Sequence, residues 1–221
     1  MLTVGHRGAS ALAPENTLRA FELAIEHSLD MAELDVHLSR DSQLMVIHDA
    51  DLQRVASRPD RVADLTAREL RALDVPTLTD VFDVARGRLG IYVELKGQGT
   101  GAALGDLLGT GAAEGVTIIG GSFIPSLVAD LARVAPDTPR SILFSRTTLQ
   151  DMLSVCAAHG ATYAHPCFRP VDKAMVNAFH ETALLVMTPH TNDADEARVF
   201  ARIGVDVIAS DDPRILVGLS A

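Results

Sequence analysis

The sequence predicts a (β/α)8 barrel of the TIM type, in a single compact domain over residues 1–221 without a large insertion. Short apolar segments alternate with longer amphipathic segments along the whole chain, which is typical of a parallel sheet covered by helices. Eight or nine such units in 221 residues fit a closed barrel better than an open sheet. No linker, low-complexity tract or fixed-period repeat divides the chain, which supports one domain.

The apolar segments predict strands over residues 2–6, 31–38, 43–48, 90–95, 116–121, 141–144, 162–165, 184–188 and 205–209. The amphipathic segments between most of them predict helices over residues 15–28, 67–73, 78–86, 101–113, 125–134, 148–158, 172–181 and 192–202. Pro125 and Pro213 suit the first turn of a helix, and Gly160 follows a helix end. Because only a turn around Asp41 and Ser42 separates two of the strands, we expect the first units to be irregular.

The composition narrows the classes of partner. The formal net charge is −10, from 19 basic and 29 acidic side chains, which argues against nucleic acid or an anionic membrane. An anionic substrate would therefore need a local positive cluster or a bound metal. Cys156 and Cys167 are too few for a disulfide framework. With no visible secretion signal and no 18-residue apolar stretch, the expectation is a cytoplasmic protein without stable membrane insertion.

Polar side chains share one face of the strand predicted over 31–38. Successive side chains of a strand point to opposite faces, so Leu34 and Val36 lie on one face. Glu33, Asp35 and His37 lie on the other face, which in a barrel points inward. Two carboxylates about 7 Å apart on an interior face are costly unless a positive charge lies between them. A divalent cation with oxygen ligands, Mg²⁺ or Ca²⁺, is the obvious candidate.

The same pattern recurs in later strands. In residues 91–97, Glu94 and Lys96 share a face opposite Val93 and Leu95, and His48 follows another buried strand. The charged residues expected at the carboxyl ends of strands, where barrels of this type carry their active sites, are His6, Arg7, Glu33, Asp35, His48, Glu94 and Lys96. The carboxylates would bind a metal that, with the cations, neutralises a phosphoryl group, while the imidazoles move protons. This combination predicts hydrolysis or transfer at a phosphate ester.

Several short motifs occur in the order seen in one enzyme family. They are HRGA (6–9), PENT (14–17), ELD (33–35), HD (48–49), PTL (76–78), ELK (94–96) and SF (122–123). With them, the sequence resembles the glycerophosphodiester phosphodiesterases over nearly the full chain. The resemblance implies a TIM barrel that uses one divalent cation, Mg²⁺ or Ca²⁺ with Mn²⁺ as a further option. Its small-molecule substrate would be a glycerophosphodiester, cleaved to glycerol 3-phosphate and an alcohol.

The resemblance also implies a role for each site residue. Glu33, Asp35 and Glu94 match the metal ligands, His6 and His48 match the acid/base pair, and Arg7 and Lys96 match the phosphate contacts. The implied mechanism has the glycerol 2-hydroxyl attack phosphorus to give a cyclic phosphate, which water then opens. Which histidine acts as the base is left open.

The PENT turn has two interpretations. Asn16 or Thr17 could cap the first helix, or the turn could take part directly in the site, with Glu15 bracing Arg7. Of the remaining histidines, those at 37, 165 and 190 lie near strand ends and could line the pocket, whereas those at 27, 159 and 180 are expected on helix surfaces.

The sequence departs from the family in three places. Only 26 residues (50–75) separate the HD and PTL motifs, which predicts no folded lid and an open mouth. Met187 stands near the place of the family's usual Trp, which weighs against an aromatic wall for a choline-like group. The segment GQGTGA (97–102) loosely matches a dinucleotide fingerprint but lacks its acidic residue, so we interpret it as a flexible rim loop. Alternative functions are hydrolysis of a lysophospholipid or another phosphodiester, or binding by an inactive homologue.

Overall fold

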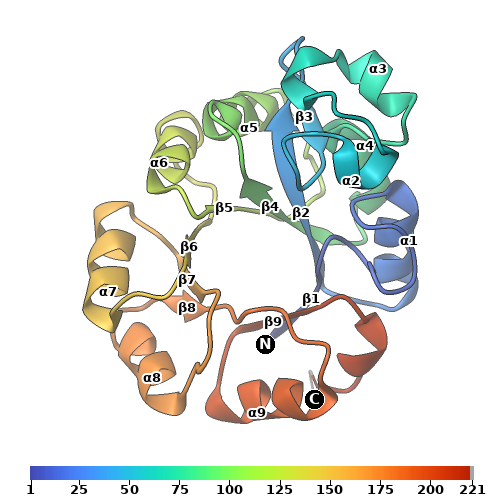
Figure 1. The fold of residues 1–221 in the computed structure, drawn as a ribbon. Helices are drawn as coiled ribbons and strands as arrows, with labels where there is room; N and C mark the ends of the chain where they lie inside the picture. The colour runs from blue at the N-terminus through green and yellow to red at the C-terminus, as the bar shows by residue number, and fades with distance from the viewer. Residues whose placement is uncertain (220–221) are drawn as a thin grey trace.

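Eight parallel strands form the predicted barrel in the computed structural model, which describes residues 1–219 (Figure 1). Their order around the ring is β8-β7-β6-β5-β4-β2-β1-β9, and a parallel bridge between Met187 and Val207 brings the two ends together. The strands are β1 (Leu2–Gly5), β2 (Met31–Leu38), β4 (Gly90–Leu95), β5 (Ile118–Ser122), β6 (Arg140–Phe144), β7 (Tyr163–Pro166), β8 (Leu185–Val186) and β9 (Val207–Ser210).

Helices surround the ring of strands (Figure 1). They are α1 (Leu18–Glu26), α2 (Gln53–Ala56), α3 (Ala67–Arg71), α4 (Leu78–Ala85), α5 (Thr100–Gly109), α6 (Pro125–Val134), α7 (Leu149–Ala158), α8 (Lys173–Glu181) and α9 (Ala194–Ile203), with 3-10 turns at Val62–Asp64 and Pro213–Ile215. Every predicted helix is present, and Pro125 lies in the first turn of α6 as expected. Among the described residues, no helix combines the length and the apolar character needed to cross a bilayer.

Two apolar clusters fill the space on either side of the strands. Leu34, Val36 and Val93 belong to the larger cluster, between the strands and the helices. Tyr92 and Ile119 belong to a smaller one made of inward-facing side chains from seven of the strands and their ends. The predicted alternation along the strands is therefore confirmed, and it leaves the inner face near the carboxyl ends of β2 and β4 to charged residues.

The strand predicted over 43–48 differs from the expectation. β3 (Leu44–Val46) pairs antiparallel with β2, with Val46 opposite Val36 and Leu44 opposite Leu38. The chain turns back after β2, and the Ile47 N–H donates to the Asp35 carbonyl at 2.9 Å. His48 follows a buried strand as predicted, but that strand returns in a β-hairpin, which brings His48 back to the level of Asp35 and makes the first units irregular as expected.

Residues 50–75 form a folded segment, although the short length of this connection predicted little room for folded structure. They contain α2, a 3-10 turn and α3. A capping box of Thr66 and Glu69 caps the N-terminus of α3. Side chains of this segment and of β3 bury a separate apolar cluster: Met45, Ile47, Leu52, Val62, Ala67, Leu70 and Val75. This small core holds the segment beside the mouth of the barrel.

The GQGTGA segment is also more ordered than predicted. α5 begins at Thr100, and a Cβ on Gly101 would lie 2.0 Å from the Leu127 carbonyl oxygen of α6. Gly101 is therefore a packing residue that lets two helices approach, rather than part of a flexible loop.

We expect Gly101→Ala to destabilise the protein by about 1–3 kcal/mol, because the added methyl group meets a backbone atom that cannot move aside. Gly109→Ala is the matched control: Gly109 lies in the same helix and has nothing within 4 Å of its Cβ position. Higher helix propensity should stabilise that variant by about 0.4–1 kcal/mol. Urea unfolding curves measure both effects, and equal midpoints for the two variants would contradict the packing role.

Candidate active site

Three carboxylates converge inside the barrel near its carboxyl edge. Glu33 and Asp35 come from β2, and Glu94 comes from β4, where it pairs in register with Asp35. All three side chains are buried, and one oxygen of each lies within 4.8 Å of the others. Burial raises the pKa of Glu33, and the charge of Asp35 raises it further. Burial likewise raises the pKa of Glu94, although Lys96 opposes the effect.

Two cations partly neutralise this cluster. The Lys96 Nζ lies 3.1 Å from Asp35 Oδ1 and 2.5 Å from Glu94 Oε1. The Arg7 Nε lies 3.4 Å from Asp35 Oδ2. Burial alone would raise the pKa of Asp35, but Lys96 and Arg7 outweigh it and the pKa is lowered. Of the three carboxylates, Asp35 is the one whose ionised form the two cations favour most.

The backbone of Arg7 is part of the same arrangement. Arg7 adopts a left-handed conformation with φ of 53°, and its backbone N–H donates to Glu33 Oε2 at 2.9 Å. Its guanidinium contacts Glu15 at 2.9 Å, which is one of the two interpretations that the sequence left open for the PENT turn. The strand thus ends in a tight turn that directs both the amide and the side chain of Arg7 toward carboxylates.

The PENT turn serves both roles considered for it. The Thr17 side chain caps α1 by accepting a hydrogen bond from the Ala20 N–H. Asn16 is buried, also has a positive φ of 57°, and donates from Nδ2 to Asp35 Oδ2 at 3.1 Å. Helix capping and support of the carboxylate cluster therefore fall on neighbouring residues.

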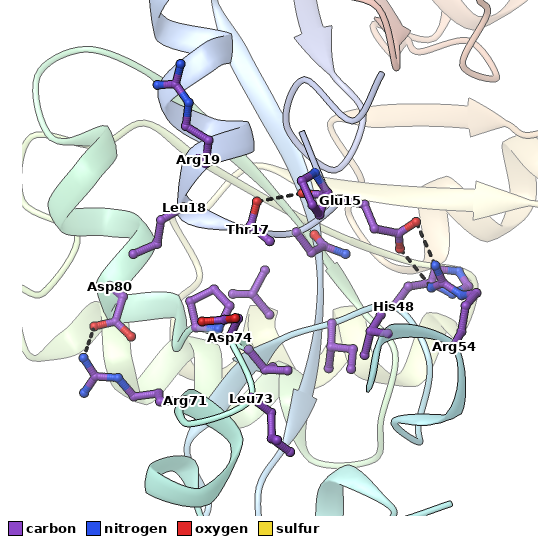
Figure 2. Close-up of a pocket in the computed structure, with 17 residues that line it drawn as sticks. Glu15, Thr17, Leu18, Arg19, His48, Arg54, Arg71, Leu73, Asp74 and Asp80 are labelled. Carbon is purple, nitrogen blue, oxygen red and sulfur yellow. Dashed lines mark hydrogen bonds and ion pairs between the residues drawn. The ribbon is translucent and has the colours of Figure 1, made fainter. Parts of the chain in front are cut away.

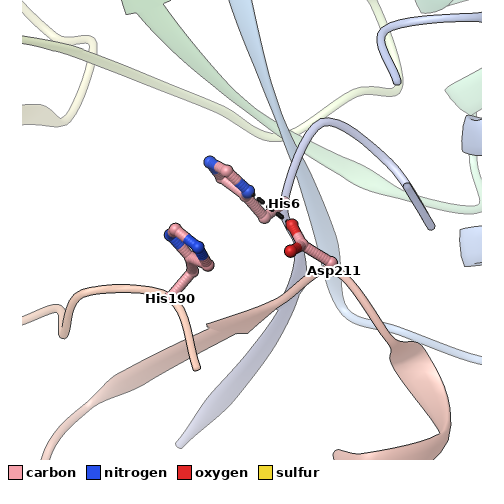
Figure 3. A group of neighbouring side chains, drawn as sticks. All are labelled: His6, His190 and Asp211. Carbon is pink, nitrogen blue, oxygen red and sulfur yellow. Dashed lines mark hydrogen bonds and ion pairs between the residues drawn. The ribbon is translucent and has the colours of Figure 1, made fainter. Parts of the chain in front are cut away.

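His6 lies beside the cluster and is held by Asp211 (Figure 3). Its Nδ1 is 2.7 Å from Asp211 Oδ1, and its Nε2 is 3.9 Å from Glu33 Oε2. Burial lowers the pKa of His6, but the hydrogen bond to Asp211 and the charge of Glu33 more than offset this and raise it. The ring of His190 stacks on His6 with 4.2 Å between centroids and 6° between planes. Because the rings are parallel, their nitrogen lone pairs do not converge, so this group is an imidazole stack rather than a metal site.

Sequence reasoning missed Asp211 as a site residue. Its Oδ1 accepts from Ser10 at 3.0 Å and its Oδ2 accepts from Asn192 at 2.6 Å, so the carboxylate is fixed from both sides. The signal was present, because Asp211 follows β9 directly and β9 pairs with β1 in the ring. His6 and Glu33 were selected because they are charged residues near the carboxyl ends of strands, and Asp211 meets the same criterion.

His48 has a similar partner. Its Nδ1 is 2.6 Å from Asp49 Oδ1, and Asp49 Oδ2 accepts from the Arg54 Nε at 2.6 Å. Arg54 also contacts Glu15 at 2.8 Å, so ion pairs connect His48 to Arg7 through the folded segment. In both histidines a carboxylate engages Nδ1, which leaves Nε2 as the nitrogen available for proton transfer.

Of the histidines expected on helix surfaces, His180 is exposed on α8, whereas His27 and His159 are half-buried at the ends of α1 and α7. The His37 Nε2 lies 3.0 Å from the His48 carbonyl oxygen, near the mouth. His165 is buried with its Nε2 2.9 Å from the Thr188 carbonyl oxygen, and burial lowers its pKa to about 4. Both cysteines are free.

We expect Lys96→Met to destabilise the metal-free protein by about 3–5 kcal/mol, because it leaves buried carboxylates without their nearest cation. Millimolar Mg²⁺ should restore part of the loss by supplying positive charge in the same place. Lys173→Met is the control, since Lys173 is exposed and its Nζ donates to the Ile203 carbonyl at 2.9 Å, with no carboxylate partner among residues 1–219. Thermal unfolding with chelator and with Mg²⁺ measures the difference, and a Lys96→Met variant as stable as the control would contradict this account.

Comparison with known proteins finds relatives that cover nearly the whole chain. The Bacillus subtilis protein YhdW is 30% identical over 98% of this chain and 97% of its own length. The glycerophosphodiester phosphodiesterase structure from Thermotoga maritima has 25% identity and a TM-score of 0.83, covering 99% of this chain and 98% of that one. An Oleispira antarctica phosphodiesterase, solved with the product sn-glycerol-3-phosphate, has 21% identity and a TM-score of 0.87, covering 100% and 97%. The sequence model of the Glycerophosphoryl diester phosphodiesterase family matches residues 6–215, and the chain belongs to that family of phosphoric diester hydrolases.

Proposed function

We propose that this protein hydrolyses glycerophosphodiesters to glycerol 3-phosphate and an alcohol, with one divalent cation. The observation that carries the proposal is the meeting of three buried carboxylates with two carboxylate-held histidines at one edge of the barrel. The product found in the Oleispira antarctica relative supports the choice of product. From the sequence, we also propose that residues 1–221 form one domain, that the protein is cytoplasmic and that it has no nucleic-acid partner.

The carboxylate cluster fits a cation. Glu33 Oε1 is buried without a hydrogen-bond partner among the described residues. Three carboxylates against two cations leave a negative excess, and a set of oxygen donors suits Mg²⁺, Ca²⁺ or Mn²⁺. Glu33, Asp35 and Glu94 would hold the ion. When bound, it would stabilise negative charge on the phosphoryl oxygens.

Arg7 and Lys96 are the proposed phosphate contacts. Each has its charged group at Asp35, 3.4 Å and 3.1 Å away, so both face the same small volume. Against a net charge of −10, such a local positive group is what would attract and orient an anionic diester. The guanidinium of Arg7 is further fixed by Glu15, which limits its movement.

The two histidines would divide the proton transfers. One Nε2 takes the proton of the glycerol 2-hydroxyl as that oxygen attacks phosphorus, and the other protonates the departing alcohol oxygen. The P–O bond to the alcohol breaks and a cyclic phosphate forms. In the second half the roles reverse: the histidine left neutral takes a proton from water as the water oxygen attacks phosphorus. The bond between phosphorus and the 2-oxygen breaks, and the protonated histidine returns its proton to that oxygen. Asp211 and Asp49 hold the rings in the orientation both halves require.

A panel of glycerophosphodiesters, with release of glycerol 3-phosphate as the readout, tests the proposal. We expect turnover with Mg²⁺, Ca²⁺ or Mn²⁺ and its loss in excess chelator, with recovery on adding the cation back. Calorimetry should show at least about tenfold weaker cation binding in Glu33→Gln, because a buried ligand is lost. Glu22→Gln on the exposed face of α1 should bind like wild type. No turnover of any diester with any cation would favour an inactive binding homologue.

We expect His6→Ala and His48→Ala each to lower kcat by at least about a hundredfold, because each removes one proton-transfer group. His159→Ala, at the end of α7, is the matched control and should keep wild-type kcat. Circular dichroism confirms folding of all three variants. A wild-type rate in either of the first two would remove that histidine from the mechanism.

A further inference from the structure

A groove of about 900 Å³ lies beside the candidate active site (Figure 2). One wall is the loop that leads into α1, including Asn16 and Leu18. The other wall consists of the chain after β3 and of residues before and within α4, including Val46, Leu73 and Pro76. This volume lies within the usual range of small-molecule sites, about 300–1,000 Å³.

At one end the groove shares two residues with the candidate active site. His48 and Asn16 both line it, and Asn16 donates to Asp35 at 3.1 Å. Figure 2 shows the Glu15–Arg54 ion pair beside His48 at this end and the Arg71–Asp80 pair at the opposite end. A substituent of a phosphate bound at His48 can therefore extend along the groove.

The lining favours an aliphatic occupant. Val46, Ile47, Val75 and Pro76 are buried, and Leu18, Leu73 and Val55 add further apolar surface. Among these described residues, Asp74 is the one charged side chain of the lining outside an ion pair. Within the part of the chain that the structure describes, the only aromatic ring in the lining is that of His48, so these residues form no cage for a quaternary ammonium group. A chain of methylene groups needs no charged partner and would gain from leaving water.

We propose that this groove binds an aliphatic chain attached to the phosphodiester, on the side of the phosphate that faces His48. The proposal rests on the function proposed above and narrows its substrate class. The chain could be an alkyl group of the departing alcohol or an acyl group on the glycerol, and the chemistry of the groove is the same for both. Each methylene group buried should raise kcat/KM by about fourfold, as expected for about 0.8 kcal/mol of transfer free energy.

Two substrate series identify the source of the chain. In the first, glycerophosphoethanol, glycerophosphobutanol and glycerophosphohexanol lengthen the departing alcohol. In the second, the 1-acetyl, 1-butanoyl and 1-hexanoyl derivatives of glycerophosphoethanol lengthen the group on glycerol. All are used below their micelle concentrations. We expect kcat/KM to rise with chain length in one series, and a flat response in both would overturn the proposal.

A double variant tests the location. Val55→Gln/Leu73→Gln makes two apolar positions of the groove polar, and it should reduce the gain per methylene at least twofold while glycerophosphoethanol turnover stays unchanged. Val199→Gln is the control, because Val199 on α9 is 41% exposed and Val55 is 44% exposed, but Val199 is not part of the groove. An unaltered chain-length response in the double variant would overturn the proposal.

Binding of ethyl, butyl and hexyl phosphate, measured by calorimetry, separates failure of the groove from failure of the proposed function. The affinities of these monoesters measure binding in the groove and do not depend on hydrolysis of a diester. If glycerophosphoethanol is not hydrolysed but hexyl phosphate binds more tightly than ethyl phosphate, and the double variant removes the difference, the groove is confirmed and the proposed function is not. Equal affinity for the three monoesters would overturn the groove.

Discussion

The burial of three carboxylates around Lys96 and Arg7 is the constraint on which the site depends. Register between β2 and β4 places Asp35 opposite Glu94, so like charges meet where little water can separate them. Lys96 and Arg7 lower the pKa of Asp35, yet the pKa of Glu33 and of Glu94 stays raised. The cluster is therefore short of positive charge, and this deficit favours a cation and an anionic substrate in the same place.

Ion pairs also join the loops around the mouth of the barrel. Arg7, Glu15, Arg54 and Asp49 form a continuous series that ends on His48. Arg54 belongs to the folded segment 50–75, whose own apolar cluster fixes its position. A short segment without a direct role in chemistry thus connects a proposed phosphate contact to a proposed acid/base group. On the other side, Ser10 and Asn192 hold the partner of His6.

The alternation of apolar and charged residues along β2 and β4 was enough to predict which side chains face inward. The apolar residues pack against the helices, so the charged residues between them face the inside of the barrel. The alternation could not predict the direction of β3, since three apolar residues form a parallel or an antiparallel strand equally well. Nor could it pair His6 with Asp211, because the contact joins residues 205 positions apart and exists only through the closure of β9 onto β1. The length of segment 50–75 alone did not predict that it folds. Its folding depends on apolar contacts between its own side chains and β3.

Local strain at the site follows from the same electrostatics. Arg7 and Asn16 both have positive φ without being glycine, which costs about 1–2 kcal/mol for each residue. Glycine would relieve that cost at either position, but it would remove the guanidinium beside Asp35 or the amide that donates to it. In the protein interior, hydrogen bonds to a charged group contribute about 1.5–3 kcal/mol each. At Asn16 the hydrogen bond to Asp35 therefore offsets the strain, and at Arg7 the hydrogen bond from the guanidinium to Glu15 does so.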